Sequence, residues 1–209
     1  MARRSDHSHE EIRDMALEAA EQIIVEHGHD GLKARKVASD IGYTVGTLYL
    51  VFKNLDDLIM HINARTLDRL HQLMTDGEMQ NLAAADRLIR LGQIYIHFAY
   101  SDPHRWALIF EHRPTDDRPT PDWYIKKTMH IFSVVEETLK PLAPLRRKSE
   151  ISQAACALWA GIHGICILGI TQKLGDVGED LVQDLARLLM VNYLNGFTNN
   201  GVPNELISA

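Results

Sequence analysis

The sequence predicts an all-α protein. Almost every segment of the 209-residue chain repeats its apolar residues at steps of three and four, which is the period of an amphipathic helix. We find no alternation of apolar and polar residues that would indicate a strand, and no internal repeat. Glycines and prolines fall where helices would end or begin. We therefore expect about nine helices: a three-helix head, a connecting helix and a larger helical body.

The head begins with a helix whose apolar residues occupy positions 12, 15, 16, 19 and 23, and which ends at Gly28. A second, short helix covers positions 33–40. Thr44 is a good N-cap for a third helix, because its hydroxyl can accept hydrogen bonds from the free amides of the first turn. Asn54 can cap the long connecting helix, which we expect to close at Gly77.

The body contains the remaining predicted helices, separated by a proline-rich segment. Pro103 suits the first turn of a short helix, and residues 111–123 form a loop because they combine three prolines with mixed charge. The predicted body helices cover about residues 81–101, 103–110, 121–139, 146–174 and 178–198. We place the domain boundary after the head, so that residues 1–58 form one domain and residues 59–209 the other.

Composition and charge indicate a globular protein with one local basic region. Hydrophobic residues make up 45% and charged residues 24% of the chain, as in ordinary globular proteins. The net charge of -6 argues against a protein that coats nucleic acid over its whole surface. Residues 31–53 nevertheless carry four basic side chains against one acidic one, whereas residues 1–30 carry three against eight. A local basic surface of this kind is sufficient to meet phosphate.

Nothing in the sequence suggests secretion or a disulfide. No apolar signal-peptide core follows the N-terminus, so we expect a cytoplasmic protein. Cys156 and Cys166 lie in one predicted helix, about 15 Å apart, which is too far for a disulfide. The apolar run 154–170 is shorter than the roughly 20 residues that a membrane-spanning helix needs, and we expect no membrane partner.

The last two predicted helices suggest a dimer. Residues 154–170 are apolar on all sides except at His163, and a helix of that kind is buried all round. The apolar residues of 178–198 also spread over a wider arc than one core face requires. We expect a homodimer through residues 146–174 and 178–198. The alternative is one deep core within a single chain.

The third helix of the head is unusually weak. Residues 44–50 include a glycine and two threonines and no charge, and glycine alone costs a helix about 1 kcal/mol relative to alanine. With the helix before it and a tight turn, it has the spacing of a helix-turn-helix, about residues 33–52, whose second helix enters the major groove of DNA. Gly46 permits close approach, Thr47 offers a hydroxyl and a methyl to a base, and Tyr49 offers its hydroxyl to a phosphate.

These residues also carry a family pattern. The stretch from Gly42 to Asn54 reads G-x-T-x-G-T-L-Y-x-x-F-K-N, and it closely resembles the DNA-binding head of the Tet-repressor (TetR/AcrR) family. The resemblance covers about residues 10–58. In the body, Trp159, His163 and Gly164 resemble the Trp-His-Gly signature of one branch of the family's C-terminal domains.

The resemblance implies a homodimeric transcriptional regulator. Such proteins bind a palindromic operator, usually repress, and release DNA when a small molecule fills the helical body. The resemblance and the local charge together assign DNA contacts to Lys33, Arg35, Lys36, Thr44, Val45, Gly46, Thr47, Tyr49 and Lys53.

Three positions depart from the family pattern. Lys33 stands where the family commonly has a capping Ser or Thr, and Val51 where a His or Tyr is usual. Leu55 replaces a lysine that touches phosphate. Losing one phosphate contact per subunit is expected to weaken non-specific DNA binding and to flatten its salt dependence.

The body contains aromatic and polar residues at helical spacing that suit a small-molecule site, although core packing explains the aromatic residues equally well. The candidate ligand-binding residues are Gln93, His97, Trp106, Phe110, Trp123, Lys127, His130, Trp159 and His163. His163 is either a core histidine bonded to a neighbouring carbonyl or hydroxyl, or a ligand contact that binds or titrates. We also expect the loop beside Trp123 to gate the pocket.

Other chemistries find no support in the sequence. The eleven histidines form no HExxH or Cys/His ligand frame, so we predict no metal and no cofactor. No nucleophile motif, paired catalytic carboxylates or phosphate-binding glycine loop is present, and we predict no enzyme. The remaining alternative is a helical small-molecule-binding module that does not bind an operator.

Overall fold

The computed structural model describes residues 7–114 and 119–198. Over these residues the chain is all-α, as predicted, with no strand. Its elements are α1 (His9–Gly31), α2 (Ala34–Asp40), α3 (Val45–Val51), α4 (Leu55–Thr75), α5 (Gly77–Gln80), α6 (Ala84–Ser101), α7 (Pro103–Glu111), α8 (Asp122–Leu139), a 3₁₀ turn (Lys140–Leu142), α9 (Lys148–Ile170) and α10 (Glu179–Thr198).

The described part of the chain has ten α-helices, one more than the nine ranges expected from the sequence. The additional helix is α5, a single turn. It forms because the Asp76 carboxylate accepts a hydrogen bond from the amide of Gly77 at 2.6 Å, which caps the turn. The connecting helix α4 ends at Thr75, shortly before Gly77, the residue expected to close it.

The chain divides into two compact units. The head unit comprises Met1–Asp68 and Asp102–Ile125, and the body unit comprises Arg69–Ser101 and Lys126–Ala209. Helix α7 therefore packs with the head, where it lies against α1. The proposed boundary after residue 58 concerns function and remains an expectation.

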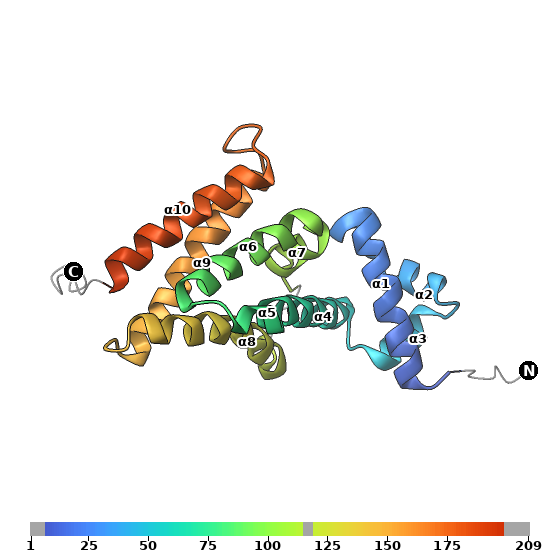
Figure 1. The fold of residues 1–209 in the computed structure, drawn as a ribbon. Coiled ribbons are helices and arrows are strands. Elements are labelled where there is room, and N and C mark those ends of the chain that lie inside the picture. Colours follow the sequence, from blue (N-terminus) through green and yellow to red (C-terminus); the bar gives the residue numbers. More distant parts are fainter. Residues whose placement is uncertain (1–6, 115–118, 199–209) are drawn as a thin grey trace, which may run out of the picture. The chain divides into compact units, whose positions relative to one another are not determined.

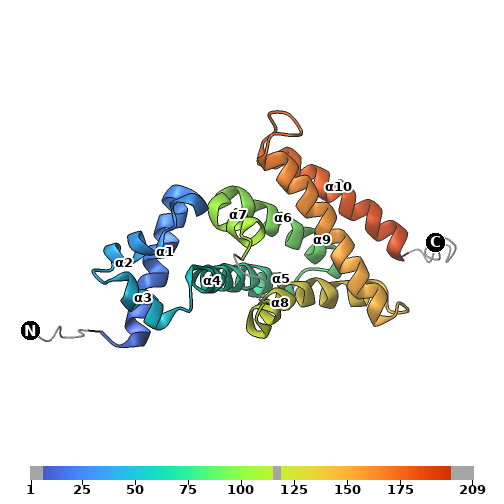
Figure 2. The same ribbon diagram turned by 180° about the vertical axis from the view of Figure 1, so that it is seen from behind.

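The core of the head is formed by α1, α2 and α3 together with side chains of α4 and α7. Figures 1 and 2 show these helices. Helix α1 starts with a capping box, in which Ser8 and Glu11 bond each other's backbone amides. It was expected to end at Gly28, but it continues to Gly31 with a kink at Gly28, whose φ is 65°. The side chains that fill the core include Ile24, Leu48 and Phe52, each at most 2% exposed.

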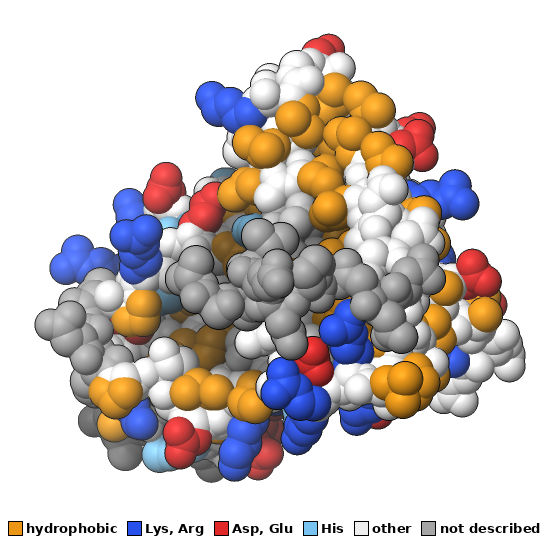
Figure 3. All heavy atoms as spheres, turned by 90° about the vertical axis from the view of Figure 1, so that its left-hand side faces the viewer, with side chains coloured by type: hydrophobic (Ala, Val, Ile, Leu, Met, Phe, Trp, Pro, Cys, Tyr) orange, Lys and Arg blue, Asp and Glu red, His pale blue; other side chains and the backbone are white. Residues whose placement is uncertain are grey.

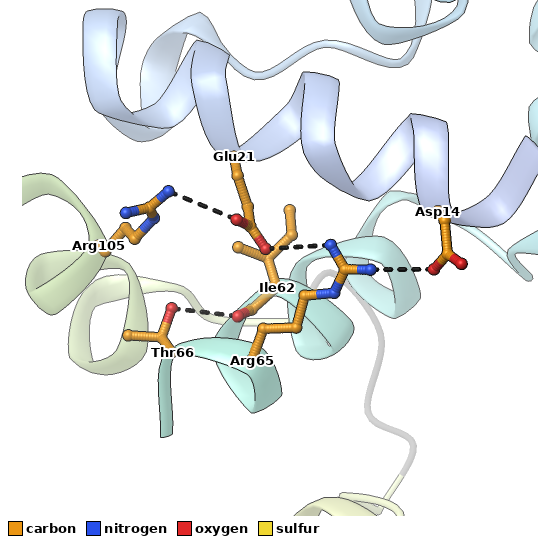
Figure 4. Close-up of polar contacts among 6 residues, drawn as sticks. All are labelled: Asp14, Glu21, Ile62, Arg65, Thr66 and Arg105. Carbon is orange, nitrogen blue, oxygen red and sulfur yellow. Dashed lines mark hydrogen bonds and ion pairs between the residues drawn. The ribbon is translucent and has the colours of Figure 1, made fainter. Parts of the chain in front are cut away.

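A cluster of ion pairs joins α1, α4 and α7 within the head. Figure 4 shows Glu21 of α1 between Arg65 of α4, at 3.5 Å, and Arg105 of α7, at 3.4 Å. Arg65 also pairs with Asp14 at 2.9 Å, and Arg105 with Asp102 at 2.8 Å. Three helices that are far apart in sequence thus share one network of alternating charges.

The body is built around α6, α9 and α10, which contact one another (Figures 1 and 2). Helices α9 and α10 approach closely at Gly161 and Gly169. A Cβ on Gly161 would lie 2.5 Å from Leu189, and one on Gly169 would lie 2.5 Å from Val182. Both cysteines are free, as expected; Cys166 is buried, and burial raises the pKa of its thiol to about 12.

Helix α9 alone among the described helices has the length and composition of a membrane-spanning segment, with a mean hydropathy of 1.6 in its most apolar window. About a third of that window, 33%, is buried in the protein. Core helices of globular proteins meet the same criterion.

Candidate DNA-binding surface and ligand cavity

Helix α3 is anchored by one side chain and capped by another. Thr44 has an extended backbone, and its hydroxyl oxygen accepts a hydrogen bond from the amide of Thr47 at 3.2 Å, which confirms the predicted cap. Leu48 points into the core and is 1% exposed. The opposite face is open to solvent at Gly46 and at Tyr49, which is 44% exposed. The weak helix is therefore held by packing and capping rather than by its own propensity.

The turn between α2 and α3 is fixed by its backbone. Gly42 has a φ of 75°, a conformation that glycine adopts without a steric penalty. The amide of Tyr43 then donates to the carbonyl of Ala38 at 2.8 Å, and Val37 and Ala38 are buried beneath it. This geometry sets the angle at which α3 leaves α2 and presents its outer face.

The basic side chains predicted to contact DNA lie on the surface near α2. Helix α2 begins at Ala34 rather than at Lys33, which occupies the N-cap position without a side-chain capping bond. Lys33, Arg35 and Lys36 are all exposed. Lys36 pairs with Asp40 at 3.0 Å, and exposed pairs of this kind exchange readily with solvent and other ions.

Two backbone amides at the start of α4 donate hydrogen bonds to side chains. The amide of Asp57 donates to Asn54 Oδ1 at 2.7 Å, as the predicted cap requires, and the amide of Lys53 donates to Asp57 Oδ2 at 2.9 Å. These two amides are therefore occupied by protein acceptors. The side chain of Lys53 is exposed, whereas Leu55 packs against the core of the head.

Arg13, which no motif of the sequence indicated, holds the end of α3 in place. Its Nη1 donates to the carbonyl of Val51 at 2.9 Å, and its guanidinium lies 4.8 Å from the ring centre of Phe52. Nη2 bonds Nε2 of His61 at 2.5 Å. Burial, followed by the charge of Arg13, lowers the pKa of His61 and so favours the neutral ring that this bond requires.

The body contains an apolar cavity of about 40 Å³. Its walls come from α4, α6, α8, α9 and α10, namely Met74, Leu88, Leu91, Gly92, Tyr95, Ile131, Phe132, Val135, Leu158, Trp159, Ile162 and Met190. None of these wall residues is charged. The hydroxyl of Tyr95 forms a hydrogen bond with Nδ1 of His163 at 2.7 Å, so a polar pair adjoins an otherwise apolar space.

Aromatic rings support this polar pair. The ring of Trp159 stacks on His163 at 5.1 Å between centres, and Phe132 meets Trp159 edge-on at 5.5 Å. Burial lowers the pKa of His163, which favours its neutral form. His163 thus has the hydroxyl partner expected of a core histidine. It also contacts two residues that line the cavity, Trp159 and Tyr95.

The other candidate ligand residues are dispersed. On α6, His97 is exposed and pairs with Glu179 at 3.0 Å, and Gln93 lies 3.5 Å from Arg90. Lys127 and His130 are on α8 and do not belong to the cavity wall. Of the nine candidates, Trp159 lines the cavity directly.

Three aromatic candidates belong to the head unit. Trp106 is buried against Phe110 at 5.2 Å between ring centres, and both are in α7. Trp123 stacks on His61 at 4.5 Å with an angle of 10° between the rings. Trp123 follows a loop of which residues 115–118 lie outside the described residues. In the part of the chain that is described, no cluster of three or more His, Cys, Asp or Glu side chains suits a metal.

The fold and this exposed helix-turn-helix define a helical regulatory protein, and sequence comparison gives the family. Residues 16–62 match the model described as bacterial regulatory proteins, tetR family. Residues 88–193 match the tetracyclin repressor-like C-terminal domain. The chain therefore belongs to the TetR family. This confirms the predicted class, a transcriptional regulator rather than an enzyme, while the Trp-His-Gly branch remains a prediction.

Individual relatives are distant. The fatty acid metabolism regulator protein of Bacillus subtilis is 26% identical over 94 residues, which cover 44% of this chain and 47% of that protein, so the match spans about half of the relative. A protein of unknown function from Rhodococcus sp. RHA1 has a TM-score of 0.74 at 17% identity, covering 95% of this chain and 100% of the other. FadR from Bacillus subtilis, solved with stearoyl-CoA, has a TM-score of 0.64 at 14% identity and covers 90% and 99%.

Proposed function

We propose that the protein is a ligand-responsive repressor that binds a palindromic operator as a homodimer and is released from DNA by a small molecule. In this proposal residues 1–58 are the DNA-binding domain, and residues 59–209 bind the ligand and form the dimer. The observation that carries the proposal is the exposed outer face of α3, which is capped by Thr44 and held from behind by Leu48.

The chemistry of this face suits DNA. The major groove, about 12 Å wide, admits a helix only closely, and Gly46 leaves the backbone accessible. Thr47 and Tyr49 offer hydroxyl groups for a base and a phosphate, and the exposed basic residues of α2 supply sequence-independent attraction. In a dimer the two copies of α3 would lie about 34–36 Å apart to read half-sites on one side of the duplex.

The dimer would form through α9 and α10. Both carry apolar side chains that the single chain leaves exposed, including Leu168 at 43%, Leu181 at 46% and Leu188 at 60%. Figure 3 shows hydrophobic side chains gathered where the end of α9 and the start of α10 lie. A second copy of the same face would cover them. Under this proposal α9 is a core and interface helix rather than a membrane span, and the protein acts in the cytoplasm.

The effector would occupy the apolar cavity of the body. A relative named as a fatty acid metabolism regulator, and a similar fold solved with stearoyl-CoA, support an effector with a fatty acyl chain. The uncharged lining of the cavity favours the same chemistry. The ligand would act by binding more tightly to a conformation that does not bind the operator, since only a difference in affinity between two states shifts their equilibrium.

One alternative remains, a helical ligand-binding module without an operator. It is favoured by Leu55, which packs on the head core where the family uses a phosphate-contacting lysine, and by Val51, which is half-buried. In that case the cavity would still bind its ligand, but the head would have no specific DNA partner.

Fluorescence anisotropy distinguishes these functions. The purified full-length chain is titrated into labelled DNA from upstream of its own gene, over a series of salt concentrations, with a scrambled duplex as control. Preferential binding of the native duplex supports a specific regulator. Equal and salt-sensitive binding of both duplexes indicates a working head and a different operator, to be selected from random DNA. Binding to neither native nor selected DNA favours the module.

A further inference from the structure

The cavity of the body is too small for its proposed role. Its volume is about 40 Å³, whereas an apolar cavity that binds benzene measures about 150 Å³. A second pocket of the body shares Met74 with it and measures about 250 Å³, but charged residues such as Arg87 and Glu137 line it. An effector that lies among the apolar walls would therefore gain its room from the movement of a wall side chain. The side chain that moves would determine which effectors fit.

Met190 of α10 is seated directly on the backbone of α6. A Cβ added to Gly92 would lie 2.8 Å from the Cε of Met190 and 3.0 Å from its sulfur. Distances this short mean that the thioether occupies space that any other residue at position 92 would need. Met190 is 1% exposed, and both residues line the cavity.

Methionine is well suited to yield this space. Its side chain is unbranched, with three rotatable bonds and a polarizable sulfur, so it changes rotamer at low cost within a core. The branched and aromatic side chains of the same wall, such as Ile162 and Trp159, are stiffer. Because position 92 is a glycine, the end of Met190 rests on backbone and has no side chain interlocked with it there.

We propose that Met190, seated on Gly92, sets the size limit of the apolar ligand that the cavity accepts, and that it moves aside when the ligand binds. The ligand is an apolar chain with at most one hydrogen-bonding group in the cavity, placed at the Tyr95–His163 pair. A charged group buried among these walls would find no partner of opposite sign, so it stays outside. This inference rests on the proposed function only in taking the cavity as the effector site.

The test is calorimetric titration of the full-length protein with straight-chain alkanols from butanol to dodecanol. In the wild type, affinity should rise about fourfold for each methylene that enters the cavity, and then stop rising at a limiting chain length. Met190→Ala should move this limit to longer chains by two or more carbons. Met190→Leu keeps a similar volume but replaces the unbranched thioether with a branched, less adaptable side chain, so it should move the limit to shorter chains.

Gly92→Ala tests the same contact from the other side. The added methyl group would come too close only to the flexible end of Met190, because Ile162 Cδ1 lies at an ordinary contact distance of 3.5 Å. The helix should therefore form while the thioether is driven into the cavity. Affinity for the alkanol at the wild-type limit should fall more than tenfold. Two matched controls lie elsewhere in the body: Met129→Ala, at a side chain 61% exposed, and Gly196→Ala, where a Cβ meets nothing within 4 Å. Circular dichroism verifies that every variant is folded.

The outcomes of these titrations distinguish the role of Met190 from the proposed DNA-binding function. An unchanged limit in folded Met190→Ala, full affinity in folded Gly92→Ala, or equal shifts in the two controls would overturn the role of Met190. Failure of the wild type to bind any alkanol would also overturn it, and would leave DNA binding, which is measured without ligand, unaffected. A limit that moves as expected supports the inference even if no operator is found.

Discussion

At the scale of single residues, Tyr49 combines exposure with a specific chemical group. It lies on the outer face of α3 and is 44% exposed, so its hydroxyl is not needed for the packing of the head. Arg13 illustrates a structural role, because its contacts with Val51 and His61 link the end of α3 to α4. Residue type alone does not separate these roles, since both side chains are polar and both belong to the head.

Tyr49→Phe should weaken operator binding while the dimer and the fold persist. The substitution removes one hydroxyl, and a hydrogen bond to a charged phosphate is worth about 1.5–3 kcal/mol, so affinity should fall by roughly tenfold or more. Anisotropy on the selected operator measures the loss, and sedimentation confirms the unchanged mass. Equal affinity of the two proteins would remove Tyr49 from the DNA contacts.

The half-buried His163 of the body predicts a dependence of stability on pH. Burial lowers the pKa of His163 below its usual value of 6.5, so the unfolded chain binds the proton more tightly than the folded chain. The contribution of the neutral ring to stability is therefore complete above about pH 6.5 and is lost as the pH falls below it. His163→Gln should reduce the drop in Tm between about pH 7.5 and 5.5.

Two other histidines and a control variant decide how the pH dependence of Tm is interpreted. His61 and His112 also have pKa values lowered by burial, so part of the drop in Tm should remain in the variant. His97→Gln, at a side chain that is 70% exposed, is the control for removing an imidazole from the body outside its core. A His163→Gln profile that coincides with the wild type would show that the ring does not titrate on unfolding.

At the scale of helices, local signals in the sequence were sufficient for most of the fold. The caps at Thr44 and Asn54 were predictable because a capping side chain bonds an amide three residues away. The short helix α5 was missed because one turn has too few residues to show a period. The DNA-binding and ligand-binding assignments remain predictions, although the head motif could be located because it occupies one continuous stretch.

The contacts that join helices were not predictable from local pattern. Arg13 lies 38 residues from Val51, and Glu21 lies 84 residues from Arg105, so no helical period connects them. The cavity is likewise formed by residues that are distant in sequence, since its wall includes Gly92, Trp159 and Met190 from three helices. Sequence periodicity shows which face of a helix is buried, but it does not show which other helix covers that face.

Glu21→Gln should loosen the packing of α1 against α4 and α7. The carboxylate lies between two guanidinium groups, and its side chain is 22% exposed (Figure 4). A neutral amide at this position would leave the positive charges of Arg65 and Arg105 without the negative charge that now lies between them. We expect a loss of about 1 kcal/mol in the free energy of unfolding, because solvent screens part of the interaction. Urea denaturation measures it.

Glu18→Gln on the same helix is the control for this experiment. Glu18 is exposed, and its replacement removes the same charge from α1 without touching the arginine pair. If both variants lose equal stability, the effect belongs to the net charge of the helix and not to the network around Glu21.

At the scale of the whole molecule, the exposed apolar residues are not distributed evenly over the helices. Leu168 of α9 and Leu181, Leu188 and Val191 of α10 are between 37% and 60% exposed. Scattered apolar side chains are normal on a protein surface, but a gathering on two adjacent helices indicates a surface that another molecule covers. For a regulator that reads a palindrome, a second copy of the chain is the partner that the operator itself requires.

Leu188→Glu should therefore dissociate the dimer without unfolding the chain. The side chain is 60% exposed in the single chain, so a carboxylate at this position remains hydrated in the monomer. In the proposed interface the same carboxylate would be buried opposite its symmetry copy, which costs desolvation and like-charge repulsion. Sedimentation velocity should give the mass of one chain where the wild type gives that of two, and operator affinity should fall more than tenfold because one head reads only half of the site.

Met129→Glu, at a side chain 61% exposed on α8, should change neither property. A Leu188→Glu protein that sediments as a dimer would place the interface on another surface, and the apolar face of α9 and α10 would then require a different partner.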